Sequence, residues 1–180
     1  MKRFALPMVL VAVAALSVSS PARAQYVFFG GGATIPTGEY GEFAKTGTMF
    51  IAGFGADIGT KGLFIEAEIG RGSNSHENTG NAKAKTNVIS AFGALGYSFG
   101  APEKKVKPYL LAGAGLVAHQ FRTDAEPALG EGTESKFGYT GAAGITAKLN
   151  EKASVWVEGR YIGSKGTSLM AALVGIQLNL

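Results

Sequence analysis

The stretch KFGYTGAAGITAKL, residues 136–149, alternates two kinds of side chain along its length. One set is mostly bulky and apolar, and includes Phe137, Tyr139, Ile145 and Leu149. The alternate set consists of lysine, glycine, threonine and alanine. Successive side chains of a β-strand point to opposite faces. The pattern therefore predicts a strand with one apolar face and one face that is small or polar.

The same period of two continues through most of the chain after residue 24. It predicts eight strands, over residues 25–34, 47–58, 62–72, 86–99, 107–122, 136–149, 153–163 and 168–180. Each is near or above the roughly 9–11 residues that a tilted strand needs to cross a bilayer. No stretch beyond residue 24 holds a run of about 18 apolar residues, so no helical span is predicted.

The two faces decide which kind of barrel the strands form. A membrane barrel turns its apolar face to lipid and its polar face to the lumen, whereas a soluble binding barrel does the reverse. The small or charged faces suit the lumen, because eight strands enclose little more than side chains. We therefore predict an all-β fold, an eight-stranded antiparallel up-and-down transmembrane β-barrel over residues 25–180.

The connections between the strands alternate in length. Long, polar ones are expected at residues 35–46, 73–85 and 123–135, and short ones at 59–61, 100–106 and 150–152. Outer-membrane barrels have long outer loops and short periplasmic turns. An even number of strands then places both termini on the periplasmic side.

Residues 1–24 are typical of a cleaved secretory signal peptide. Lys2 and Arg3 precede an apolar run over residues 4–18, and Ala22-Arg23-Ala24 is a small-residue cleavage site. This leader holds three of the 17 basic residues and none of the 13 acidic ones, so its removal lowers the net charge from +4 to +1. A nearly neutral chain is not expected to bind nucleic acid. The absence of cysteine excludes disulfides.

The leader, the alternating strands and the opening YVFFGGG, residues 26–32, resemble the outer-membrane β-barrel domain family. That family includes small OmpA/OmpX-type barrels and opacity-like, porin-family surface proteins. The resemblance implies a bacterial outer-membrane location, with membrane lipid and lipopolysaccharide as partners. It also implies that the barrel-assembly machinery recognises the last strand through Gly175, Leu178 and Leu180, although the family usually ends in an aromatic residue. A closed barrel has no free edge, so a monomer is expected.

Charged residues fall on the predicted lumen faces. An unpaired charge in a narrow lumen is costly, so we expect an ion-pair network centred on Arg160 with Glu66 or Glu68. The full set of expected members is Glu66, Glu68, Glu158, Arg160, Lys136 and Lys148.

Aromatic residues gather near both predicted rims. Aromatic rings favour the headgroup region of a bilayer, where they form two girdles. The expected girdle residues are Phe50, Tyr97, Phe99, Tyr109, Phe121, Phe137, Tyr139 and Tyr161.

Signals for chemistry are weak. The string GAGLVA, residues 113–118, has nucleotide-motif spacing, but no helix follows it. His119 lacks a serine two positions later, because residue 121 is Phe121, and interfacial packing is the better interpretation. We therefore expect no catalytic, cofactor-binding or metal-binding residues.

The preferred function is a non-enzymatic barrel for envelope integrity or surface adhesion through its loops. The alternatives are a narrow porin-like channel, a lipid-modifying enzyme and a soluble periplasmic binding barrel.

Overall fold

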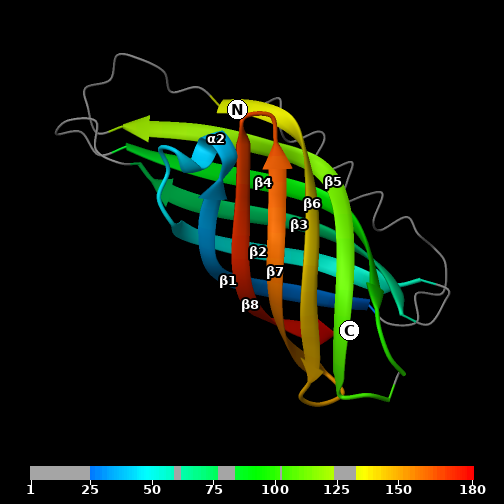
Figure 1. Cartoon of the computed structure of the whole chain (residues 1–180). Coiled ribbons are helices and arrows are strands. Elements are labelled where there is room, and N and C mark those ends of the chain that lie inside the picture. The colour runs from blue at the N-terminus through cyan, green and yellow to red at the C-terminus, as the bar shows by residue number, and fades with distance from the viewer. Residues whose placement is uncertain (1–24, 59–61, 77–83, 102, 124–132) are drawn as a thin grey trace.

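The computed structural model describes residues 25–58, 62–101, with a gap at 77–83, and 103–180, with a gap at 124–132. The described chain forms a closed barrel in which eight antiparallel strands pair in sequence order and the last closes onto the first (Figure 1). The predicted fold is confirmed. The strands are β1 (Gln25–Thr37), β2 (Gly47–Asp57), β3 (Leu63–Ser75), β4 (Ala84–Ser98), β5 (Val106–Thr123), β6 (Thr133–Lys148), β7 (Ala153–Ser164) and β8 (Thr167–Asn179). The expected leader lies outside the described residues.

Each predicted strand overlaps one observed strand, and the differences lie mainly at one end of the barrel. There β3 continues to Ser75, and β4 already begins at Ala84. A short helix, α2 (Gly38–Gly41), occupies part of the expected loop at residues 35–46. The backbone of Gly38 has a φ of +59°, a conformation that favours glycine and lets the chain turn out of β1. No helix among the described residues is both long and apolar enough to cross a membrane.

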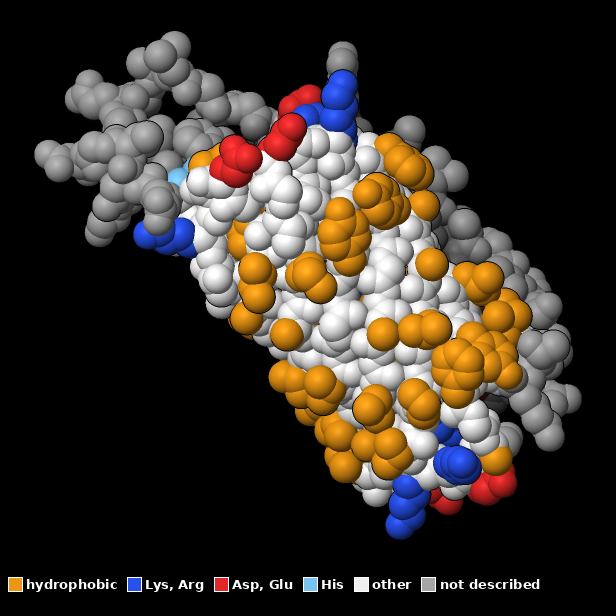
Figure 2. Space-filling model, in the orientation of Figure 1, with side chains coloured by type: hydrophobic (Ala, Val, Ile, Leu, Met, Phe, Trp, Pro, Cys, Tyr) orange, Lys and Arg blue, Asp and Glu red, His pale blue; other side chains and the backbone are white. Residues whose placement is uncertain are grey.

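The outer wall of the barrel is apolar. Phe137 is 71% exposed and Val157 is 60% exposed, and both point away from the lumen. Figure 2 shows apolar side chains spread over the wall, with acidic and basic side chains gathered at its two ends. Lumen-facing side chains such as Arg160 and Leu169 are buried. The apolar face therefore lies outside, as the sequence predicted.

The two ends of the barrel differ. The turn end carries the β2–β3, β4–β5 and β6–β7 connections, the start of β1 and the end of β8. There the Leu180 amide donates to the Gln25 carbonyl at 2.8 Å. The loop end carries α2, the β3–β4 and β5–β6 connections, and the tight turn between β7 and β8 at residues 165–166. Gly166 in that turn has a φ of +79°.

Side chains fill the half of the lumen nearer the loop end. Val88, Phe92, Val117 and Leu169 are almost completely buried there. Polar contacts lie closer to the rim, where the Asn74 side-chain amide donates to the Thr34 hydroxyl and to the Lys45 carbonyl, both at 2.9 Å. This half of the barrel is therefore a packed core.

Candidate functional site

The charged side chains that meet inside the lumen come from two strands on opposite sides of the barrel. β3 carries Glu66 and Glu68, and β7 carries Glu158 and Arg160. Four pairings separate these strands in either direction around the sheet. Alternation along each strand points all four side chains inward, so the curvature of the closed sheet brings them together.

Arg160 joins the two sides of the lumen. Its Nε donates to Glu158 Oε1 at 2.6 Å, and its Nη1 donates to Glu68 Oε1. The Arg160 side chain is 1% exposed, and the side chains of Glu68 and Glu158 are each 2% exposed. Charged groups this deeply buried require partners. The planar guanidinium, whose N–H donors have a fixed geometry, thus donates hydrogen bonds to both carboxylates.

Two tyrosines donate further hydrogen bonds to Glu158 and Glu66. Tyr109 donates to Glu158 Oε2 at 2.9 Å, and Tyr26 donates to Glu66 Oε1 at 2.8 Å. We call the set Glu66, Glu68, Glu158, Arg160, Tyr26 and Tyr109 the charged plug. Sequence reasoning missed both tyrosines. Tyr109 was expected in a girdle, and this was wrong, because its side chain faces the lumen.

The two lysines of β6 do not join the charged plug. Lys136 lies toward the loop end and pairs with Glu134 at 3.0 Å. Lys148 lies at the turn end, where it is exposed. Both occupy lumen-side positions, as predicted. They lie near opposite ends of β6, too far along the strand to reach Arg160. Their expected membership of the network was therefore wrong.

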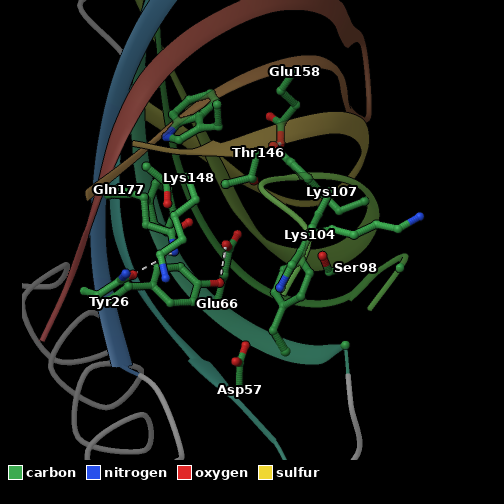
Figure 3. A pocket seen from close by; sticks show the side chains of 18 of the residues that line it. Tyr26, Asp57, Glu66, Ser98, Lys104, Lys107, Thr146, Lys148, Glu158 and Gln177 are labelled. Atoms are coloured by element: carbon green, nitrogen blue, oxygen red, sulfur yellow. Dashed lines mark hydrogen bonds between the residues drawn. The ribbon is translucent and has the colours of Figure 1, made fainter. Parts of the chain in front are cut away.

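A cavity of about 580 Å³ lies between the charged plug and the turn end. Figure 3 shows side chains around this space from several strands, among them Tyr26, Glu66 and Lys148, and from the β4–β5 connection, which carries Lys104. Glu66, Glu158 and Arg160 line its inner part, and exposed lysines line its outer part. The lumen therefore consists of an open vestibule, a charged layer and an apolar core.

Comparisons with known proteins fit this architecture. The family model of the outer membrane protein β-barrel domain matches residues 8–178. The chain belongs to this family. No significant match to a curated protein was found.

Solved structures of outer-membrane barrels share the fold at low sequence identity. Neisserial surface protein A is 15% identical with a TM-score of 0.59, and the match covers 86% of this chain and 96% of that one. Ail of Yersinia pestis, solved in complex with a heparin analogue, is 12% identical with a TM-score of 0.56, covering 87% and 97%. OprG of Pseudomonas aeruginosa is 17% identical with a TM-score of 0.52, covering 87% and 96%.

Most of the expected girdle residues of this outer-membrane barrel lie on its outer wall. Tyr97 and Phe99 form a T-shaped ring pair 5.0 Å apart near the turn end. Tyr139 and Tyr161 lie 6.0 Å apart near the loop end. Exposed Phe50 and Phe137 occupy outward positions toward the same end. Phe121 belongs to β5, but its side chain lies outside the described residues.

His119 has a different environment from the interfacial one that the sequence suggested. It lies at a lumen-side position of β5, and its Nε2 is 3.2 Å from Ser164 Oγ. A serine hydrolase needs a further group to orient the histidine. Among the described residues, none forms a hydrogen bond with His119 Nδ1. The described residues also contain no group of three histidine or acidic side chains that could hold a metal ion.

Proposed function

We propose that this chain is a non-enzymatic barrel with a sealed lumen, which supports the outer membrane mechanically and presents its loop end at the cell surface. The observation that carries the proposal is the arrangement of the lumen, where the Arg160 ion pairs and the apolar core occupy successive layers. A channel needs a continuous water path through both layers.

The charged plug argues against transport for an energetic reason. Separating Arg160 from Glu68 and Glu158 would leave buried charges without partners, which costs several kcal/mol. Beyond it, a passing ion would meet Phe92, Val117 and Leu169, none of which offers a ligand. A closed wall and a filled lumen suit a protein that acts through the stability of its barrel and through the residues at its two ends.

Planar-bilayer recording tests the sealed lumen. The natural chain is expected to insert without producing discrete current steps. A variant with Arg160→Ala, Glu68→Ala and Phe92→Ala, checked for folding by heat-dependent electrophoretic mobility, removes the cross-lumen ion pair and one large ring of the apolar core, and should conduct more than the natural chain. Regular current steps from the natural chain would overturn the proposal and favour the narrow porin-like channel.

We further propose that the turn end faces the periplasm and that the last strand, with Gly175, Leu178 and Leu180, engages the barrel-assembly machinery. The barrel would lie in the membrane as a monomer among lipid and lipopolysaccharide. The sequence has no cysteine, so single-cysteine variants report location directly. A membrane-impermeant maleimide should label Lys165→Cys in intact cells and Lys152→Cys only after the outer membrane is opened. The reverse result would invert the orientation.

A further inference from the structure

The vestibule at the turn end is lined mainly by lysines at its mouth and by carboxyl groups at its floor. Four lysines and two acidic residues line the mouth: Lys104, Lys105, Lys107, Lys148, Asp57 and Glu151. The excess of cations makes the mouth positive. At the floor, the carboxyl groups of Glu66 and Glu158 line the cavity with a single guanidinium, that of Arg160.

Glu66 is the floor carboxylate that remains available. Arg160 is engaged by Glu68 and Glu158. Glu66 accepts a hydrogen bond from Tyr26, and within the described chain no lysine or arginine forms an ion pair with it. The side chain lines the cavity, so a small molecule that enters the vestibule reaches it. A cationic donor there would supply the partner that this carboxylate lacks.

Aromatic rings form much of the wall between the mouth and the floor. The lining includes Tyr26, Phe28, Phe64, Tyr109 and Trp156. Phe64 and Tyr109 lie 6.1 Å apart in an edge-on pair, and Phe28 and Trp156 lie 6.4 Å apart in another. Aromatic faces attract ammonium groups that approach them out of bulk water. The wall therefore suits a cation that passes inward to Glu66.

We propose that this vestibule binds a small molecule in which an amine and a phosphate are a few atoms apart. The amine would contact Glu66 at the floor, and the phosphate would remain among the lysines of the mouth. Lysine ammonium groups bind phosphate as point charges. The shared chemistry is a phosphoethanolamine group, carried either by a free metabolite or by a lipid headgroup.

The fluorescence of Trp156 provides a direct readout, because Trp156 is the only tryptophan in the sequence and lines the cavity. The folded full chain in detergent micelles would be titrated with phosphoethanolamine, with ethanolamine alone and with inorganic phosphate alone. We expect a saturable change in emission with phosphoethanolamine. Each half alone should bind at least about tenfold more weakly, since it loses one set of charge-assisted contacts.

Matched variants assign the two ends of the ligand. Glu66→Gln keeps an acceptor for Tyr26 and removes the charge, and Lys148→Gln removes one cation of the mouth. Each should weaken binding of phosphoethanolamine by about tenfold. Glu103→Gln and Lys152→Gln change exposed charges at the same end that do not line the cavity. These two controls should bind like the natural chain.

A parallel titration with short-chain phosphatidylethanolamine separates the two sources. Binding of free phosphoethanolamine at least as tightly as the lipid supports a free metabolite, and tighter binding of the lipid supports a headgroup. The proposal is overturned if neither probe gives a saturable change, or if Glu66→Gln binds as well as Glu103→Gln. Because the proposed sealed lumen is tested by conductance, that claim can fail while this one stands.

Discussion

Arg160 on β7 and Glu68 on β3 form an ion pair across the lumen, between residues 92 positions apart in the sequence. Glu158, two residues before Arg160, holds the same guanidinium from its own strand at 2.6 Å. The pair thus links two walls of the barrel that share no backbone hydrogen bonds. This ion pair, together with the apolar core, fills the interior of the barrel.

Arg160→Leu should destabilise the barrel by about 3–5 kcal/mol, because it leaves buried carboxylates without their cation. Urea unfolding in lipid vesicles measures the free energy. The combination of Arg160→Leu with Glu68→Gln and Glu158→Gln removes the charges together, and should regain much of the loss. If Arg160→Leu unfolds at the same urea concentration as the natural chain, the ion pairs do not stabilise the barrel.

Gly30→Ala should disturb the packing of the indole ring inside the barrel. A Cβ atom at this position would lie 2.5 Å from Trp156 Cζ2 and 2.6 Å from the Val174 carbonyl oxygen. Such overpacking costs about 1–3 kcal/mol, and the emission of Trp156 should shift. Gly93→Ala is the matched control, since a Cβ there meets no atom within 4 Å. Equal stability of the two variants would show that Gly30 is not needed for close packing.

Replacing an outer-wall residue with arginine should lower the free energy of unfolding, and the loss should be larger for a residue that lies deeper in the membrane. Val157 lies midway along β7, and Val106 begins β5 at the turn end, and both are exposed. We expect Val157→Arg to lower the unfolding free energy by about 2–4 kcal/mol and Val106→Arg by about 0–1 kcal/mol. Unfolding in vesicles provides both values. A smaller cost at Val157 would contradict the assignment of this wall to lipid.

Acid should loosen the contact between the segment that follows α2 and the rim of the barrel. His76 Nε2 lies 2.6 Å from Thr86 Oγ1, and the His76 ring lies 5.3 Å from that of Phe43. Burial lowers the pKa of His76 below its usual value, so the neutral form favours the folded rim. This contribution is complete above the unfolded pKa of about 6.5 and is lost as pH falls through the lower folded pKa.

Hydrogen exchange of residues 38–46 measures that loosening. Exchange, corrected for its intrinsic pH dependence, should increase between about pH 7.5 and pH 5 in the natural chain. In His76→Gln, this pH-dependent increase should be absent. The same pH dependence in both chains would assign the effect to another group.

The period of two made the strands predictable, because alternation was clear wherever one face was bulky and the other small. It also placed Glu66 and Glu68 in the lumen, since they alternate with Ile65 and Ala67 in the sequence. The face occupied by Tyr109 was not predictable in this way. Its strand has apolar residues or glycine on both faces, so alternation alone left the inward face undecided.

The partners of Arg160 were only partly predictable. Glu68 was one of two expected partners, whereas Glu158 was expected in the network without being assigned to Arg160. Which carboxylates reach Arg160 depends on strand tilt and on the stagger of the closed sheet, because these determine which residues of opposite walls lie at the same depth in the lumen. The short helix α2 depends on the burial of Tyr40, a tertiary contact that no local pattern reveals.

One-sided labelling of the vestibule tests the central claim of a sealed lumen most directly. Thr146 lines the cavity, so Thr146→Cys reports which end of the barrel admits a membrane-impermeant maleimide. Lys152→Cys and Lys165→Cys mark the turn end and the loop end. The sealed lumen predicts that Thr146→Cys is labelled only under the conditions that label Lys152→Cys. Labelling of Thr146→Cys when only Lys165→Cys is accessible would mean that the lumen is open, and would contradict the account.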